Sequence, residues 1–425
     1  MRHYSISPSF LNGSVIIPPS KSQTMRAILF AALAKGTSTI QNYLDSSDTN
    51  CMLQACKMLG ANIEINNNRI EIEGINGYIP TIDDVIHAGN SGIILRFLTG
   101  IAALSSNYTV ITGDRSLRSQ RSMSPMIDAL NQLGAFTVSS RGDSFAPVIV
   151  KGPIKGGKVE ISGKDSQPIS SLLIACSLAE GTTELIAHNS GEKPWVDLTL
   201  HWLEKLGGRC KNENYAKYTI FGNTRFQCFD YTVPGDWSSA AFPIAAALVT
   251  KSSLTLENVD WKDPQGDKNI VDVLIQMGAH IEIDEKTKRL YFHRTGRLKG
   301  SVIDVNPIID AVPILAVLAC FAEGETRLMN AGIARTKECD RLHCITQELQ
   351  KMGADIIEQE DSLIIRGKEL YGAKLNSHED HRLAMSLAIA AMGAKGDSVL
   401  ENVDCISKTF PDFAQTFLSL GAKLS

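Results

Sequence analysis

Six copies of one phrase decide the architecture of this chain: MLGANIEI (58–65), QLGAFTVS (132–139), KLGGRCKN (205–212), QMGAHIEI (276–283), KMGADIIE (351–358) and SLGAKLS (419–425). In each copy an amphipathic run ends at Leu-Gly-Ala or a near match, and an extended pattern follows. The glycines recur about every 72 residues, a period typical of repeated supersecondary units. Because glycine adopts a positive φ at little steric cost, we expect each of these glycines to end a helix.

A second helix is expected in every unit, and it is apolar nearly all round. Examples are the segments 25–36, MRAILFAALAKG, and 311–324, AVPILAVLACFAEG. Helices of this composition are buried. A strand phrase such as SSLTLENV (252–259) follows most of them. One unit therefore contains a buried helix, a strand, a surface helix and two strands, which predicts an α/β (α+β) fold with mixed sheets.

Six small units do not share a single core, so we expect two domains of three units each. The predicted domains are residues 20–235, and residues 236–425 closed by residues 1–19. The N-terminal segment Tyr4–Ile17 is expected to be one strand that supplies the strand missing after the last repeat. Two crossings between the domains would then form a hinge.

Composition excludes several classes of protein. The chain has 425 residues, is 44% hydrophobic and 21% charged, and carries a formal charge of −4. These values are ordinary for a globular protein and argue against long disorder or a nucleic-acid-binding surface. The longest apolar stretch, 311–322, is shorter than the roughly 20 residues of a membrane span. The nine cysteines include no CxxC pair, so no disulfide framework or zinc ribbon is indicated. We therefore expect a cytoplasmic protein with neither a membrane nor a nucleic acid as partner.

Polar residues gather at the predicted starts of the buried helices, where unpaired N–H groups attract anions. The segments are PSKSQTMR (19–26), GNSGIILR (89–96), KDSQPISS (164–171), GDWSSAAF (235–242), PIIDAVP (307–313) and HEDHRLAM (378–385). Asp236 and Ser238 are equally typical of ordinary helix caps. Capping does not explain cations in a first turn, where the helix dipole disfavours them. We infer that four cations serve a ligand or a carboxylate partner: Lys21, Arg26, Arg96 and Arg382.

These segments, together with RTKECDRL (335–342) and SKTFPDF (407–413), resemble the 5-enolpyruvylshikimate-3-phosphate (EPSP) synthase family along essentially the whole chain. The resemblance implies two similar domains, each of three βαβαββ units, joined by a two-strand hinge and closing over the substrates. It implies transfer of the enolpyruvyl group of phosphoenolpyruvate to the 5-hydroxyl of shikimate 3-phosphate, with release of phosphate, in the sixth step of the shikimate pathway. It also implies a monomer that needs no cofactor or metal and is a target of glyphosate.

The resemblance assigns roles to individual residues. Asp310 corresponds to the base that accepts the hydroxyl proton, Glu338 to the acid that protonates the methylene carbon, and Lys21 to a residue reaching both substrates. The residues implied for shikimate 3-phosphate are Lys21, Ser22, Arg26, Asp165, Ser166, Gln167, Trp195, Asp310 and Lys337. Those implied for phosphoenolpyruvate are Lys21, Asn90, Gly92, Arg121, Gln167, Arg341, His381, Arg382 and Lys408.

The chain departs from the family pattern near the substrate's 3-phosphate. Asp165 and Glu192 stand where the family commonly has serine, and two carboxylates would repel the phosphate unless they point away, cap helices or pair with a lysine. Ile93 and Phe97 are bulkier than usual, and we expect them to reduce sensitivity to glyphosate. The arginine loop 113–123 is one residue longer than usual, which leaves Arg118 as a substitute for Arg121.

Two other functions compete with this one. The sister enolpyruvyl transferase acting on UDP-N-acetylglucosamine carries a reactive cysteine on a mobile loop, but this chain has no Cys between 57 and 175. A non-catalytic binding protein with the same fold is favoured only by Asp165 and Glu192. The segment 378–381, His-Glu-Asp-His, lacks further ligands at metal-binding spacing, so we expect no metal site there.

Overall fold

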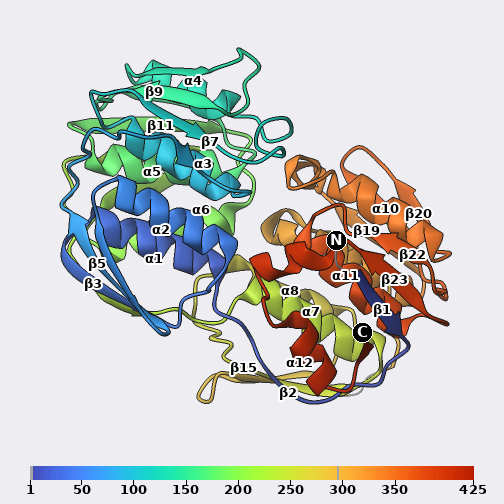
Figure 1. Ribbon diagram of the computed structural model, residues 1–425. Helices are drawn as coiled ribbons and strands as arrows, with labels where there is room; N and C mark the ends of the chain where they lie inside the picture. The colour runs from blue at the N-terminus through green and yellow to red at the C-terminus, as the bar shows by residue number, and fades with distance from the viewer. Residues whose placement is uncertain (1–2, 294–295) are drawn as a thin grey trace. The chain divides into compact units, whose positions relative to one another are not determined.

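The computed structural model describes residues 3–293 and 296–425 and contains two compact units. The central unit is residues 21–233. The terminal unit combines the N-terminal residues up to Ser20 with residues 234–425. Figure 1 shows both, with the helices of each unit flanked by strands.

The central unit contains three four-stranded sheets of identical topology. In each, the first two strands are parallel and the remaining pairs are antiparallel. The strand orders are β14 (Asp230–Thr232), β3 (Lys35–Gln41), β5 (Arg69–Ile75), β4 (Asn62–Asn66); β6 (Ile86–His87), β7 (Thr109–Thr112), β9 (Val148–Lys151), β8 (Phe136–Ser139); and β10 (Lys158–Ser162), β11 (Thr182–His188), β13 (Lys217–Phe221), β12 (Arg209–Glu213).

The terminal unit repeats this topology three times. Its strand orders are β2 (Asn12–Ile16), β15 (Ser253–Glu257), β17 (Arg289–Phe292), β16 (Ile281–Asp284); β18 (Val302–Asp304), β19 (Glu325–Met329), β21 (Ser362–Arg366), β20 (Asp355–Glu358); and β22 (Lys374–Asn376), β23 (Ser398–Glu401), β1 (His3–Ser7), β24 (Lys423–Leu424). The six repeated mixed units confirm the predicted fold class.

One buried helix precedes the second strand of every sheet. These helices are α1 (Lys21–Leu33), α3 (Gly92–Ala102) and α5 (Ser166–Leu178) in the central unit, and α7 (Trp237–Val249), α9 (Val312–Phe321) and α11 (His381–Gly393) in the terminal unit. Nearly all of their side chains are buried, as their all-round apolar sequences predict. The helices α7, α9 and α11 pack against one another.

The remaining helices, which are more amphipathic than the buried ones, and short 3₁₀ helices complete the units. They are α2 (Ser47–Met58), α4 (Ser124–Gln132), α6 (Lys193–Lys205), α8 (Ile270–Gln276), α10 (Arg341–Lys351), α12 (Phe413–Ser419), η1 (Gly266–Asn269), η2 (Asn306–Ala311), η3 (Gly332–Thr336) and η4 (Val403–Lys408).

The N-terminal segment differs from its prediction as a single strand. It forms two strands, β1 and β2, that belong to two different sheets. Pro8 follows β1 directly, and because proline has no N–H to donate, it ends the ladder there. β1 is the third strand of the last sheet, between β23 and β24, while β2 runs parallel to β15.

The six repeat glycines all have a positive φ, between +85° and +99°, which confirms them as helix ends. At Gly134 an added Cβ would have no heavy atom within 4 Å, so the glycine is required there by its backbone conformation alone. Within the described part of the chain, no helix has both the length and the apolar character needed to cross a membrane.

Replacing Gly134 by alanine tests this backbone requirement. We expect Gly134→Ala to lower the free energy of unfolding by about 1–2 kcal/mol, the cost of a left-handed conformation for an L residue, measured by urea denaturation. Gly157→Ala is the control, because Gly157 has an ordinary φ and its added Cβ would meet only Leu133 at 3.7 Å. Equal stability of the two variants would contradict this explanation.

Candidate functional site

Arg341, the first residue of α10, is the centre of a buried charge cluster in the terminal unit. Its Nε donates to Asp380 Oδ2 at 2.8 Å, its Nη1 to Asp310 Oδ1 at 2.7 Å and its Nη2 to Glu338 Oε2 at 2.9 Å. The Arg341 side chain is only 1% exposed. Three carboxylates around one guanidinium keep the arginine charged inside the protein.

Asp310 lies in η2, directly before the buried helix α9, and contacts two arginines. In addition to Arg341, Arg382 Nη2 donates to Asp310 Oδ2 at 3.3 Å. Burial alone would raise the pKa of Asp310, but Arg382, Arg341 and Lys337 together hold it well below its usual value. Asp310 is therefore an ionised acceptor surrounded by cations.

Glu338 bridges Arg341 and Lys408. Lys408 Nζ, at the end of η4, lies 2.9 Å from Glu338 Oε1. His381, the first residue of α11, has Nδ1 at 4.0 Å from the same oxygen and is itself buried. The structure thus brings together six predicted site residues in this unit: Asp310, Lys337, Glu338, Arg341, Arg382 and Lys408, with His381 beside them.

Arg382 is less fully satisfied than Arg341. It is 3% exposed, and its Nε and Nη1 have no hydrogen-bond partner among the described residues. Its guanidinium lies 5.9 Å from the ring centroid of Phe242 in α7. Buried guanidinium nitrogens without an acceptor are unfavourable, so Arg382 is suited to an anionic ligand.

Two carboxylates that the sequence did not single out complete this cluster. Asp380 caps α11 by accepting from the amides of Arg382 and Leu383, and it also holds Arg341. Asp267 in η1 accepts from Ser238 Oγ, and burial together with repulsion from Asp310 raises the pKa of Asp267 to about 7. The segment 378–385 contained a signal for Asp380 as a cap. No local signal marked Asp267, because its neighbours come from distant segments.

Asp236, the residue before α7, acts as a helix cap. Its carboxylate accepts from the amides of Ser238 and Ser239. The capping interpretation of Asp236 is therefore confirmed.

Arg26 is one of the buried cations of the central unit. Its Nε and Nη2 donate to Thr199 Oγ1 at 3.0 and 2.9 Å, and its Nη1 donates to the carbonyl of Ser22 at 3.2 Å. The Arg26 guanidinium also lies 5.3 Å from the ring centroid of Phe97. Burial lowers the pKa of Arg26 to about 9, and the described residues bring no carboxylate to it. A buried arginine held by neutral acceptors alone favours an anion as its further partner.

Lys21 lies in the same helix as this arginine, and Trp195, distant along the chain, contacts it. Lys21, the first residue of α1, has Nζ 3.9 Å from Asp48 Oδ2. The carbonyl of Trp195, in the first turn of α6, accepts from Arg26 Nη2 at 3.3 Å. The start of α1 and the start of α6 thus meet at Arg26.

A second group of central-unit residues surrounds the start of α3. Arg121 Nη2 donates to Asn90 Oδ1 at 3.2 Å, and Arg96 Nη1 donates to Gln167 Oε1 at 2.7 Å. A Cβ added to Gly92 would meet the ends of the Arg96, Arg121 and Gln167 side chains at 2.8–3.1 Å, so these polar groups approach the Gly92 backbone closely. Arg118 lies outside this group and is exposed, which favours Arg121 over Arg118 as the site residue.

Asp165 and Glu192 are both accommodated at the start of α5. Asp165 caps the helix by accepting from the amide of Gln167, and its Oδ2 lies 3.2 Å from Arg96 Nη2. Glu192, which is 1% exposed, has a left-handed φ of 47°, and its Oε2 accepts from both the amide and the hydroxyl of Ser166 at 2.9 Å. Glu192 therefore occupies donors that an anion would otherwise find at this helix start.

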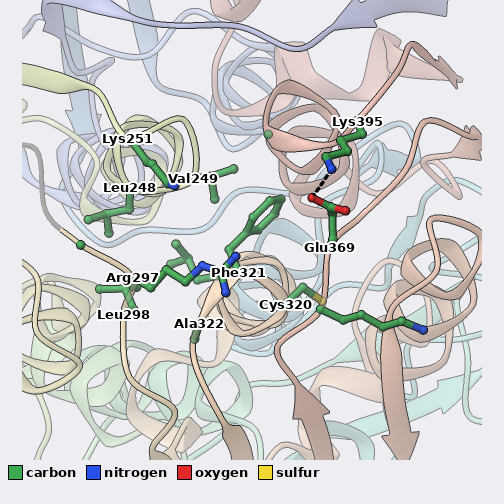
Figure 2. Close-up of a pocket in the computed structure, with 14 residues that line it drawn as sticks. Leu248, Val249, Lys251, Arg297, Leu298, Cys320, Phe321, Ala322, Glu369 and Lys395 are labelled. Atoms are coloured by element: carbon green, nitrogen blue, oxygen red, sulfur yellow. Dashed lines mark ion pairs between the residues drawn. The ribbon is translucent and has the colours of Figure 1, made fainter.

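A cavity and a group of metal-ligating side chains lie away from these clusters. The cavity, of about 200 Å³, is at the C-terminal ends of α7, α9 and α11 and is lined by residues such as Val249, Phe321 and Lys395 (Figure 2). Within the described ranges, the one group of three metal-ligating side chains is His280, Glu282 and His293, at the hairpin of β16 and β17. In the segment 378–381, where no metal site is expected, His378 contacts Glu348 and Asp380 accepts from the amide of Arg382.

Buried cations at the starts of repeated helices, with three carboxylates around Arg341, are features typical of an enzyme for small anionic substrates. The sequence profile of EPSP synthase (3-phosphoshikimate 1-carboxyvinyltransferase) matches residues 7–417, and the chain belongs to this family.

Individual relatives match along their full length. The chain is 44% identical over 420 residues to the 3-phosphoshikimate 1-carboxyvinyltransferase of Acetivibrio thermocellus, covering 99% of this chain and 98% of that protein. It is 47% identical over 424 residues to that of Chlamydia abortus, covering 99% and 94%. A solved EPSP synthase structure from Acinetobacter baumannii superposes with a TM-score of 0.84 at 28% identity, covering 100% of this chain and 99% of that one.

The raised pKa of Asp267 predicts a specific pH dependence of stability. Because the pKa of Asp267 is about 7 in the folded state and about 3.9 in unfolded chains, the folded state binds the extra proton between these values. Protonation of Asp267 therefore contributes fully to the free energy of unfolding at low pH, and this contribution is lost as pH rises toward 7. We expect Asp267→Asn to gain stability relative to wild type by on the order of 2–4 kcal/mol between pH 4 and 8.

Urea denaturation of both proteins at several pH values measures this difference. Asp304→Asn is the control, because Asp304 is exposed on β18. A stability difference between wild type and Asp267→Asn that does not change with pH would contradict the raised pKa.

Proposed function

We propose that this protein catalyses transfer of the enolpyruvyl group of phosphoenolpyruvate to the 5-hydroxyl of shikimate 3-phosphate, releasing phosphate, in the shikimate pathway. Full-length similarity to 3-phosphoshikimate 1-carboxyvinyltransferases supports the reaction. The observation in the structure that carries it is the sharing of Arg341 by Asp310 and Glu338, which are the proposed base and acid.

The central unit supplies the proposed contacts for the carboxylate and phosphate of shikimate 3-phosphate. Arg26 is buried without a carboxylate partner among the described residues, so a substrate carboxylate would compensate its charge. Ser22, Lys21 and Trp195 lie in the same two helix starts. At the start of α5, Ser166 and Gln167 are the proposed contacts of the phosphate.

Phosphoenolpyruvate carries a carboxylate and a phosphate, and forked arginine donors suit both groups. In the terminal unit the proposed contacts are Arg341, Arg382, His381 and Lys408, and the open nitrogens of Arg382 support this assignment. In the central unit they are Lys21, Asn90, Gly92, Arg121 and Gln167, of which Gly92, Arg121 and Gln167 are packed together.

The proposed mechanism uses two proton transfers. Asp310 accepts the proton of the 5-hydroxyl as its oxygen attacks C2 of phosphoenolpyruvate, and Glu338 delivers a proton to the methylene carbon. The product is a tetrahedral ketal phosphate, which loses phosphate to give the enolpyruvyl ether. Lys337 lies close enough to Asp310 to lower its pKa and is the proposed contact of the substrate hydroxyls.

The lowered pKa of Asp310 makes it a weak base in the free enzyme, because Arg382, Arg341 and Lys337 stabilise its negative charge. Anionic substrates bound to these cations would neutralise part of their charge. The pKa of Asp310 would then rise, and its ability to accept a proton would improve only when substrate is bound.

We further propose that the enzyme acts as a monomer in the cytoplasm. The family resemblance supports the monomer, which size-exclusion chromatography with light scattering tests. The nine cysteines are all free, as is typical of a reducing compartment.

Phosphate release tests the proposed function directly. We expect release from phosphoenolpyruvate to require shikimate 3-phosphate, and Asp310→Ala to lower kcat by about 10²–10⁴-fold, the usual contribution of a general base. Asp304→Ala, at an exposed aspartate outside the cluster, is the control and should retain activity. Release without shikimate 3-phosphate, or an active Asp310→Ala protein, would contradict the proposal.

Glu192 tests the phosphate site. The Glu192 carboxylate accepts hydrogen bonds from the amide and the hydroxyl of Ser166. It therefore repels the substrate phosphate and competes with it for these two donors. We expect Glu192→Gln to bind shikimate 3-phosphate about tenfold more tightly by calorimetry, since one nearby negative charge is removed. The variant should also be less stable, because it loses a charged acceptor at the start of α5. Glu180→Gln, at an exposed glutamate, is the control, and unchanged or weaker binding by Glu192→Gln would place the phosphate elsewhere.

A further inference from the structure

Two cysteines flank the start of α10, directly beside Arg341. Asp340 is the helix cap, so Cys339 precedes the cap and Cys344 is the fourth helical residue. Side chains at these two positions pack on each other in the hydrophobic staple that fixes how the chain enters a helix. Both cysteines are 8% exposed, and they form a small cluster with Leu383 that is separate from the main core. The two thiols lie close enough to shift each other's pKa.

Cys344 is linked to an imidazole and a carboxylate. His378 lies close enough to Cys344 to lower the pKa of the thiol, and His378 Nε2 lies 2.8 Å from Glu348 Oε1. Glu348 is 1% exposed and also accepts from Lys351 Nζ and from the amide of Asn376. The order of thiol, imidazole and carboxylate is the arrangement that activates nucleophilic cysteines.

The backbone holds His378 in this position. His378 and Glu379 have φ values of 52° and 58°, two consecutive non-glycine residues in the left-handed region. Such conformations are unfavourable and persist where the surrounding structure enforces them, often at functional sites. The amide of His378 donates to Asn376 Oδ1 at 2.7 Å, which fixes the turn.

This environment favours the thiolate of Cys344. The neighbouring Cys339 and His378 lower the pKa of the Cys344 thiol to about 6, and burial and Asp340 oppose this shift. The neighbouring Cys344 and the contact with Glu348 raise the pKa of His378 to about 9. Burial instead raises the pKa of other thiols, including Cys56 and Cys320, to about 12. Thiolate character determines which cysteine is oxidised first.

Cys339 links this pair to the charge cluster. It follows Glu338 in the chain, and its Sγ lies 3.7 Å from Asp380 Oδ2, the oxygen that also accepts from Arg341 Nε. A covalent bond at Cys339 would remove its hydrogen bond to Asp380 and displace the segment that carries Glu338.

We propose that Cys339 and Cys344 form a peroxide-sensitive dithiol whose oxidation to a disulfide inactivates the enzyme. The Cys344 thiolate attacks one oxygen of hydrogen peroxide, the O–O bond breaks, and a sulfenic acid and hydroxide form; the hydroxide takes up a proton to become water. The Cys339 sulfur then attacks the Cys344 sulfur, the S–O bond breaks, and the departing hydroxide takes the Cys339 proton to leave as water. Two thiols are oxidised and one peroxide is reduced to two waters. The loss of activity rests on the proposed function, whereas disulfide formation does not.

Peroxide treatment of the full-length protein, followed by peptide mass mapping and phosphate-release assays, tests the proposal. We expect loss of two hydrogen atoms, a cross-linked Cys339–Cys344 peptide, and an activity loss of tenfold or more that dithiothreitol reverses. Cys344→Ser should keep its activity in peroxide, whereas Cys228→Ser, at an exposed thiol, should lose it like wild type. Both thiols remaining fully alkylatable after peroxide, or equal peroxide sensitivity of Cys344→Ser and wild type, would overturn the proposal.

The role of His378 is tested by the rate at which iodoacetamide alkylates Cys344. We expect His378→Asn to slow alkylation at pH 7 about tenfold or more, because the thiolate loses its imidazolium partner. His343→Asn is the matched control, because His343 lies on the same helix as Cys344, α10, but its imidazole contacts Glu358. An alkylation rate in His378→Asn equal to that of wild type would contradict activation by His378. This readout needs no enzyme activity, so it stands if the proposed function fails.

Discussion

The contact of one guanidinium with three carboxylates is the interaction on which the terminal unit's chemistry depends. Arg341 donates hydrogen bonds to Asp310, Glu338 and Asp380, and each of these carboxylates also contacts a second group. Asp380 caps α11, Glu338 also holds Lys408, and Asp310 also holds Arg382. A buried cation with ionised partners is stable only if all are present, because removal of one leaves an uncompensated charge. The same contacts therefore both position these carboxylates and balance the buried charge of Arg341.

The two buried arginines Arg341 and Arg26 have different kinds of partner. In the terminal unit, the cations are compensated by carboxylates of the protein. In the central unit, Arg26 is held by the hydroxyl of Thr199 and by carbonyls, and burial lowers its pKa. A buried arginine of this kind binds an anionic ligand strongly because the ligand supplies the missing charge. The start of α5 shows the opposite case, since Glu192 already supplies an anion there.

Much of the fold follows from the sequence because it depends on local signals. The six glycines, the all-round apolar helices and the strands after them are each recognisable within a dozen residues, and repetition strengthens the pattern. The N-terminal segment was predicted as one strand because alternation alone does not show that a chain changes sheets. Pro8, which cannot continue a ladder, was the local sign of the break between β1 and β2.

The candidate site was predictable only in part. Cations in first turns stand out because the helix dipole disfavours them, so Arg26, Arg96 and Arg382 could be selected from the sequence. The partners of these cations could not, because Thr199 and Asp267 come from distant segments and are ordinary residues in their own surroundings. For Asp165 and Glu192 the sequence left several arrangements open, and the structure has both at the start of α5.

Surrounding cations keep Asp310 ionised in the free enzyme, and the proposed mechanism depends on this charge. Carbon-13 NMR of aspartate carboxyl groups, with the Asp310 signal assigned from its absence in Asp310→Asn, measures this directly. We expect the Asp310 signal to stay unchanged from pH 7 to about 4, where exposed aspartates are about half protonated. A signal from Asp310 that titrates in that interval would show that Arg341 and its neighbours do not control its charge.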